Sequence, residues 1–209
     1  MDFFYGAMSG NSARVAFGLA EAGAKYQPRL LDTRKGENRL PEYLAVNPMG
    51  KIPSLVDGAL KLWESNAINW YLAERFPQGR LLPSSIEGRA EVHRWLFFQM
   101  AHVSPPAVTV FRATHPRVKA FWGAEPEAAA VAAARKELAR FLPLLEWRLS
   151  DCEWLAGEFS IADIAYAPHL FMLAGGNFDF SPYPRLHAWF DRLQARPARR
   201  KVVEMIYGG

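Results

Sequence analysis

A short polar turn near the amino terminus carries side chains that suit anion binding. Residues 9–12 read Ser-Gly-Asn-Ser, follow an apolar run at 2–5, and precede a segment whose apolar residues recur at helical spacing. This order predicts a strand, a turn and a helix that ends near Gly23. The free N–H groups and the dipole at a helix amino terminus stabilise negative charge. The turn could therefore donate hydrogen bonds to a bound thiolate, or Ser9 or Ser12 could only cap the helix.

The first 76 residues predict a small mixed α/β domain with the order βαβαββα. Strands are expected at 2–5 and 26–31, a helix that follows the polar turn at 8–12 and stops at Gly23, further helices at 41–46 and 64–76, and a hairpin across Asp57-Gly58. Pro28 places the second strand at a sheet edge, because proline cannot donate to a ladder. The order resembles a thioredoxin-type fold, whose Cys-x-x-Cys motif falls where this chain has residues 9–12. Cys152 is the single cysteine of the sequence, so a protein thiol cannot act in that turn.

The remainder of the chain reads as helix. Residues 77–86 are rich in proline and small polar residues, which is typical of a linker. Helical patterns follow at about 87–104, 125–149, 160–174 and 184–195. Ser160 and Asp163 predict a capping box, a folding element without chemistry. The expected organisation is a thioredoxin-like domain at 1–76, a linker at 77–86 and an all-α domain at 87–209.

Composition narrows the class of protein. The chain has 209 residues, of which 50% are hydrophobic and 22% charged, which excludes intrinsic disorder. No stretch approaches the roughly 18 uninterrupted apolar residues of a membrane span, and the amino terminus lacks the features of a secretory signal. A single cysteine fits a reducing compartment. We therefore expect a cytoplasmic protein that is not embedded in a membrane.

Charge and histidine spacing bear on the partners. The net charge of +4 is mild, and its densest run, at residues 196–201, is typical of a solvated helix end. No nucleic acid partner is expected. The five histidines show no metal-ligand spacing, and no phosphate-binding glycine loop is present. We expect neither a metal nor a nucleotide.

Two further positions suit the recognition of a peptide-like ligand. Pro53 directly precedes a predicted strand and is a candidate cis proline, which would turn the backbone N–H and C=O of Ile52 toward an extended ligand. Glu64 and Ser65 open a helix, where free N–H groups suit a carboxylate and the Glu64 side chain suits an ammonium. An α-amino acid end of a ligand offers both groups. Ser65 is also an ordinary capping residue, and that interpretation is compatible with this one.

These motifs together resemble those of a soluble glutathione S-transferase. The first domain carries Asn47-Pro48-x-Gly50-Lys51-Ile52-Pro53 and Trp63-Glu64-Ser65-x-Ala67-Ile68, and the second carries Ser160-Ile161-Ala162-Asp163-Ile164-Ala165. By position, Ser9 is similar to the catalytic serine of the theta, phi, tau and zeta classes. Asn11 matches a second donor of some bacterial Nu-class members. Tyr5 ranks third, since a tyrosine at a strand end is also a common core residue.

The resemblance implies which residues bind the two substrates. Glutathione, as a co-substrate and with no other cofactor, would contact residues of the first domain: Asn38, Arg39, Lys51, Ile52, Pro53, Glu64 and Ser65. Arg39 and Lys51 could equally be ordinary surface charges. A small hydrophobic electrophile would meet Met8, His102, Val103 and Phe111, although an aromatic-rich helix is more often packed core. Members of the family usually dimerise, so a homodimer is expected.

Three functions remain open at this stage. The resemblance favours a transferase that joins glutathione to electrophiles in detoxification, after Ser9 stabilises the thiolate. Asn11 beside Ser9 also suits a glutathione-dependent disulfide reductase or peroxidase. A non-catalytic module that binds glutathione or another protein would keep the same binding residues.

Overall fold

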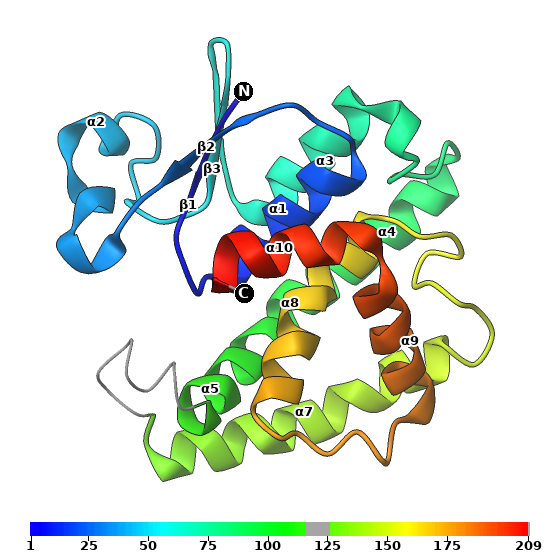
Figure 1. Cartoon of the computed structure of the whole chain (residues 1–209). Helices are drawn as coiled ribbons and strands as arrows, with labels where there is room; N and C mark the ends of the chain where they lie inside the picture. Colours follow the sequence, from blue (N-terminus) through cyan, green and yellow to red (C-terminus); the bar gives the residue numbers. More distant parts are fainter. Residues whose placement is uncertain (116–125, 209) are drawn as a thin grey trace. The chain divides into compact units, whose positions relative to one another are not determined.

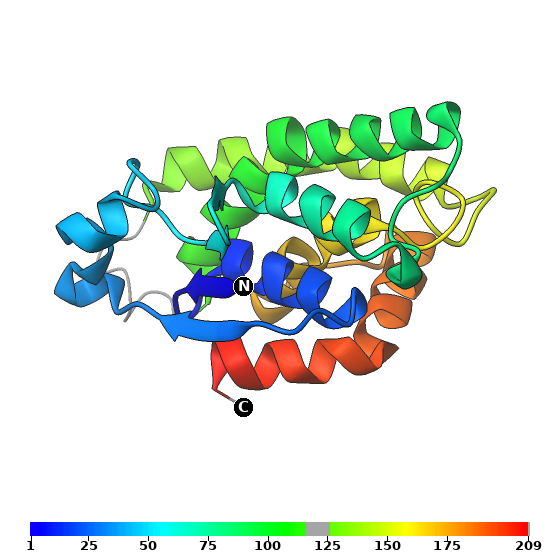
Figure 2. The same cartoon turned by 90° about the horizontal axis from the view of Figure 1, so that it is seen from above.

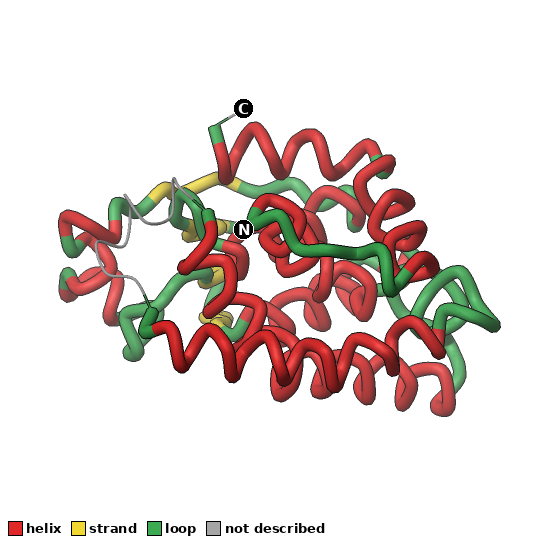
Figure 3. Tube along the Cα trace, turned by 90° about the horizontal axis from the view of Figure 1, so that it is seen from below, coloured by secondary structure: helices red, strands yellow, loops and turns green. Residues whose placement is uncertain are grey.

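The computed structural model describes residues 1–115 and 126–208. The chain forms two compact units, one of residues 1–82 with 196–209 and one of residues 83–195. Figure 3 shows that the strands belong to the first unit, whereas the described part of the second unit consists of helices joined by loops. The predicted combination of a mixed α/β domain and a helical domain is confirmed.

The first unit holds a four-stranded sheet in the order β2-β1-β3-β4. Its elements are β1 (Asp2–Tyr5), α1 (Gly10–Glu21), β2 (Gln27–Leu30), α2 (Pro41–Leu44), β3 (Ser54–Asp57), β4 (Leu60–Trp63), α3 (Ser65–Arg75) and α10 (Pro197–Tyr207). β1 runs parallel to β2 and antiparallel to β3, and β3 pairs with β4 as the predicted hairpin. β2 lies at the edge, where Pro28 is tolerated because its missing N–H faces no ladder partner there.

Alternation along β1 directs its aromatic rings to opposite faces of the sheet. Phe3 is fully buried, and its ring lies 5.7 Å from that of Tyr26. Phe4 lies 5.6 Å from Tyr43 of α2. The Tyr43 hydroxyl donates to the carbonyl of Lys51 and is 2.8 Å from Ser54 Oγ. The Tyr43 ring thus packs α2 against β1, and its hydroxyl joins α2 to the segment that precedes β3.

Helix α1 is sandwiched between α3 and α10 (Figures 1 and 2). Its residues Val15, Phe17 and Leu19 are at most 1% exposed, so the helix is covered on more than one side. The sequence division placed residues 196–209 with the helical domain, whereas the structure groups them with the first unit. The reason is the apolar side of α10, where Val202 and Ile206 are buried.

The basic run at 196–201 is solvated only in part, because Arg200 and Lys201 are exposed whereas Arg196 and Arg199 are not. Arg196 Nε and Nη2 donate to Glu21 Oε1 and Oε2 at 2.6 and 2.7 Å, which joins the start of α10 to the end of α1. Arg199 is only 5% exposed, and burial lowers the pKa of its guanidinium. The expectation from the charge pattern was wrong for these two residues because one face of a basic helix can still be covered.

The second unit is built from helices. They are α4 (Ile86–Phe98), a π-helical segment (Gln99–Val103), α5 (Ser104–Thr114), α7 (Ala128–Arg148), α8 (Ile161–Gly175) and α9 (Pro184–Ala195). The first residue of the helix predicted at 125–149 lies outside the described residues. The sequence pattern stopped at Pro105-Pro106 and missed α5. Both prolines fall in the first turn of α5, where a backbone N–H has no intrahelical partner.

A buried carboxylate organises the core of this unit. Asp163 Oδ1 accepts from Leu155 N at 2.9 Å and from Trp189 Nε1 at 3.1 Å, and Oδ2 accepts from Ser160 N at 3.0 Å. The predicted capping box at Ser160 and Asp163 is confirmed. On the same helix, the Tyr166 hydroxyl donates to the carbonyl of Trp95 at 2.9 Å. Helix α8 is thereby joined to α4 and α9 by polar groups inside an apolar core.

Candidate active site at the amino terminus of helix α1

Ser9 is the N-cap of α1, and its Oγ accepts from Ser12 N at 3.2 Å. Ser12 is fully buried, and its Oγ accepts from Gly6 N at 3.2 Å. The two serines therefore have different roles: Ser12 holds the end of β1 to the helix, and Ser9 remains partly exposed. The cap uses a lone pair of Ser9. Within residues 1–115 and 126–208, its hydroxyl proton has no partner.

The backbone before Ser9 is held by the carboxyl-terminal helix. Met8 has φ of 56°, a conformation that non-glycine residues rarely adopt, and its N–H donates to the carbonyl of Ile206 at 2.9 Å. Sequence patterns had suggested no connection between these segments. The contact makes α10 part of the support of the turn.

Asn11 and Tyr5 differ in their surroundings. Asn11 is exposed, and its Oδ1 accepts from Arg14 Nη1 at 3.0 Å. Tyr5 stacks on Phe3 with ring centroids 5.5 Å apart, and its proximity contributes to the raised pKa of Tyr26, after the larger effect of burial. Tyr5 therefore belongs to an aromatic cluster with these two rings.

Ile52 lies beside the end of β1. A Cβ atom at Gly6 would come within 2.2 Å of Ile52 Cδ1, so any larger residue there would displace the end of the Ile52 side chain. The Ile52-Pro53 peptide bond is cis, as predicted. Across the described part of the chain, neither the N–H nor the C=O of Ile52 has a hydrogen-bond partner. These two groups are available to an extended ligand.

Glu64 and Ser65 begin helix α3. Glu64 has φ of 69° and ψ of 110°, a strained conformation for a residue with a Cβ. Its side chain is exposed and does not cap the helix. Ser65 is 6% exposed, and its Oγ accepts from Arg14 Nη1 at 2.6 Å. Backbone strain of this kind clusters at functional sites, so the conformation of Glu64 is the strongest indication from the backbone that the first unit holds a functional site.

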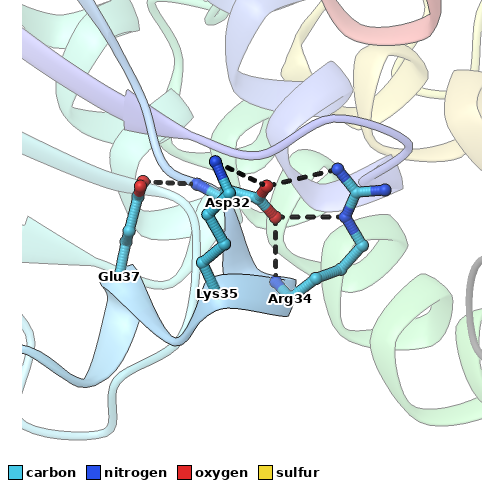
Figure 4. A network of polar contacts seen from close by, with 4 residues as sticks. All are labelled: Asp32, Arg34, Lys35 and Glu37. Carbon is cyan, nitrogen blue, oxygen red and sulfur yellow. Dashed lines mark hydrogen bonds and ion pairs between the residues drawn. The ribbon is translucent and has the colours of Figure 1, made fainter.

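A local network shapes the loop after β2 (Figure 4). Asp32 accepts from the backbone N–H and the guanidinium of Arg34, at 3.0 and 3.1 Å for Oδ1, and Lys35 Nζ lies 3.9 Å from its Oδ2. The hydrogen bond from Arg34 is the main cause of the lowered pKa of Asp32. Glu37 Oε2 accepts from Asp32 N at 2.7 Å. This turn determines where the following residues, Asn38 and Arg39, emerge.

Asn38 and Arg39 bind the loop that carries Lys51. Asn38 Nδ2 donates to the carbonyl of Gly50 at 2.6 Å, and Arg39 Nη1 donates to that of Met49 at 3.5 Å. Asn38 Oδ1 is buried without a partner in the described residues. The Lys51 side chain is exposed. The structure thus brings together the three residues that the sequence assigned to one end of the ligand.

The residues assigned to the electrophile fall in both units. Met8 belongs to the first unit, and the other three belong to the second. Val103 and Phe111 are 0% and 4% exposed, which fits core packing. His102 is exposed, and its ring lies 4.5 Å from that of Phe141. His102 is therefore the most accessible of these three.

The described residues contain neither a membrane-spanning helix nor a cluster of metal-binding side chains. No described helix has the length and apolar character needed to cross a bilayer. No group of three or more histidine, cysteine or acidic side chains in residues 1–115 and 126–208 is arranged to hold a metal ion.

Family models match both parts of the chain. The model for the glutathione S-transferase N-terminal domain matches residues 1–74, and that for the C-terminal domain matches residues 99–197. The chain belongs to the glutathione S-transferase family. The resemblance inferred from the sequence motifs is confirmed, and so is the assignment of the chain as a glutathione S-transferase.

Relatives of this transferase match it over nearly the full length. It is 35% identical to glutathione S-transferase F10 from Arabidopsis thaliana, with 95% of this chain and 94% of the relative covered. It is also 35% identical to glutathione S-transferase GstB from Escherichia coli, with 93% of each covered. The solved structure of glutathione S-transferase-I bound with lactoylglutathione has a TM-score of 0.87 and 28% identity, and covers 96% of this chain and 97% of that one.

Sequence reasoning missed Arg14. Arg14 is 3% exposed, and its guanidinium donates to both Asn11 and Ser65. An arginine near the start of an amphipathic helix normally faces water, and its partner on α3 lies 51 residues away. The local sequence carries no signal for such a contact.

Proposed function

We propose that this transferase binds glutathione in its first unit and attaches its sulfur to small hydrophobic electrophiles, with Ser9 stabilising the thiolate. The observation that supports the role of Ser9 is that the oxygen and the proton of its hydroxyl can serve different partners. The oxygen accepts from Ser12 N, and the proton remains for a ligand. Capping and thiolate binding are therefore simultaneous roles of one side chain.

The gain expected from one such hydrogen bond matches what the chemistry needs. A free thiol of pKa about 8.5 is roughly 3% ionised at pH 7, and lowering the pKa by about two units makes it about three-quarters ionised. That change corresponds to about 2.7 kcal/mol, within the roughly 1.5–3 kcal/mol of a hydrogen bond to a charged group. The helix dipole of α1 acts in the same direction.

The rest of the tripeptide is assigned to the groups that the structure leaves available. The N–H and C=O of Ile52, before Pro53, would pair with the cysteinyl unit. Glu64 would bind the ammonium of the γ-glutamyl end, and Ser65 with the first N–H groups of α3 its carboxylate. Asn38, Arg39 and Lys51 are proposed for the glycine carboxylate or its surroundings. The relative bound with lactoylglutathione supports a ligand of this type.

In the proposed reaction, the thiol proton passes to solvent before the attack. The thiolate then forms a carbon–sulfur bond with the electrophile, and the displaced group leaves with its bonding electrons. Met8 and His102 are proposed contacts of the electrophile.

We further propose that the protein is a cytoplasmic homodimer. Phe97 of α4 is 69% exposed, and an apolar side chain on the surface supports an interface there.

The test compares two serines that cap helices. Ser85 caps α4, and its Oγ accepts from Gly88 N at 3.0 Å, outside the candidate site. Both Ser9→Ala and Ser85→Ala should lower stability by about 1 kcal/mol. Only Ser9→Ala should raise the thiol pKa of bound glutathione and lower kcat. If Ser9→Ala changes neither, Ser9 is not the donor.

A second reaction follows from the exposed amide of Asn11, which is a second donor near Ser9. A glutathione-dependent disulfide reductase would use both groups. Parallel assays with chlorodinitrobenzene and hydroxyethyl disulfide separate the reactions, and activity with the disulfide alone would replace the transferase proposal. Binding of glutathione without either activity would indicate a non-catalytic module.

A further inference from the structure

Arg14 connects two parts of the candidate site that lie on different helices. Its Nη1 donates to Asn11 Oδ1 at 3.0 Å, on the first turn of α1, and to Ser65 Oγ at 2.6 Å, at the start of α3. The carbonyl of Arg14 accepts from Asn69 Nδ2 at 3.1 Å, which fixes its backbone against the same helix. One buried guanidinium therefore contacts both the predicted thiolate region and the predicted γ-glutamyl region.

The chemistry of a guanidinium decides how its neighbours are oriented. Arginine has donors and no acceptor, so Asn11 must turn its oxygen toward Arg14, because a flipped amide would oppose two donors. Ser65 must likewise offer a lone pair. The Asn11 Nδ2 group and the Ser65 hydroxyl proton then have no partner in the part of the chain that is described. Two groups that could accept or donate are thereby left as donors.

We propose that Arg14 is a positioning residue that makes Asn11 and Ser65 donors toward two anionic groups of bound glutathione, its thiolate and its γ-glutamyl carboxylate. Asn11 would then donate to the thiolate and Ser65 to the γ-glutamyl carboxylate. This inference rests on the proposed function. It goes further by assigning one buried cation to both subsites, without contact between that cation and the ligand.

The charge of Arg14 persists at neutral pH. Burial lowers its pKa to about 10, while Glu64 and Tyr207 act in the opposite direction. Tyr207 lies at the end of α10, and burial raises the pKa of its phenol to about 12. Both the cation and the neutral phenol therefore keep their states between pH 6 and 9, and the donors keep their orientation over the range of an activity assay.

Single substitutions should separate the two effects. Asn11→Ala should raise the thiol pKa of bound glutathione by about one unit, with little change in Kd. Ser65→Ala should raise the Kd about tenfold, with little change in the thiol pKa. Arg14→Met should do both. Arg14→Lys keeps a donor without an acceptor and should restore most of both values, which a role in packing alone would not produce.

A control variant removes an arginine that lies outside the candidate site and is partly buried. Arg148 lies in the second unit, and its Nε donates to the carbonyl of Leu155 at 2.9 Å. Arg148→Met should lower the midpoint of unfolding without changing the Kd or the thiol pKa. The Kd of glutathione is measured by calorimetry, and the thiol pKa is measured from the ultraviolet absorbance of the bound thiolate against pH. Both are measured on variants whose circular dichroism matches that of the wild type.

Asn11→Asp keeps the experiment decisive if Arg14→Met does not fold. Its exposed side chain would still accept from Arg14 but would present an anionic oxygen in place of Nδ2. The thiol pKa should then rise more than in Asn11→Ala. The inference is overturned if both Asn11 variants leave the thiol pKa unchanged, or if a folded Arg14→Met variant leaves both quantities unchanged. If the wild type itself neither binds glutathione nor lowers its thiol pKa, the proposed function fails instead.

Discussion

Replacing Asp163 by alanine is expected to remove a large part of the stability of the helical unit. The carboxylate is fully buried, and it accepts from the N–H groups of Leu155 and Ser160 and from Trp189 Nε1. Each donor left without a partner costs about 1–3 kcal/mol. Allowing for overlap between them, the loss is about 3–6 kcal/mol, a large share of the roughly 5–15 kcal/mol that stabilises a domain.

Asp163→Asn separates the charge of this group from its shape. The amide oxygen still accepts from Leu155 and Trp189, but the amide nitrogen faces the N–H of Ser160. We expect a loss of about 1–3 kcal/mol, smaller than that of the alanine variant. Asp191→Asn is the matched control, because this carboxylate on α9 is 69% exposed. Its effect should stay within about 0.5 kcal/mol.

Asp163→Asn also tests how the free energy of unfolding depends on pH. Burial raises the pKa of Asp163 from 3.8 to about 6, against the opposing hydrogen bonds from Leu155, Ser160 and Trp189. The folded state therefore binds this proton more tightly than the unfolded state does. The contribution of Asp163 falls as the pH rises from about 4 to 6, by about 3 kcal/mol in total. This component should be absent from Asp163→Asn.

The assay is urea unfolding of each variant from pH 4 to 7, followed by far-ultraviolet circular dichroism and tryptophan fluorescence. Agreement between the two probes shows whether one transition describes both units. The reasoning about the buried carboxylate is refuted if Asp163→Ala costs no more than Asp191→Asn. The pH argument alone is refuted if the wild type and Asp163→Asn have the same dependence on pH.

Three further predictions concern the first unit. Glu64→Gly should raise the free energy of unfolding by about 1 kcal/mol, because it relieves a positive φ, and it should also weaken glutathione binding. Denaturation measures the first effect and calorimetry measures the second on the same sample. An unchanged affinity for glutathione would contradict the role of Glu64. Gly6→Ala should displace Ile52 and raise the glutathione Kd, and the added substitution Ile52→Ala should recover it; lack of recovery would show that the clash is not the cause. Glu21→Gln should cost about 1–2 kcal/mol by weakening the pair with Arg196, measured as a lower Tm at low salt; an unchanged Tm would mean that this ion pair does not help to hold α10 in place.

Much of the first unit could be predicted from the sequence because its signals are local. Apolar spacing located the strands and helices, and Asp57-Gly58 located the hairpin. Pro28 indicated an edge strand through its missing N–H, and Pro53 indicated the cis bond through its position before a strand. The absence of cysteine from residues 9–12 directed attention to hydroxyl donors. Each of these conclusions depends on a few neighbouring residues.

Only the tertiary structure decided how those residues are supported. Arg14 reads as a surface charge, yet it is buried against Ser65. The basic run at 196–201 reads as solvated, yet α10 packs on α1 and its Ile206 carbonyl holds Met8. The physical reason is range: steric and hydrogen-bonding preferences act between neighbours, and the sequence therefore determined the donors at the start of α1. Which surfaces meet determines whether a charge is buried, so the burial of Arg14 against Ser65 and the support of Met8 by α10 were set by tertiary contacts.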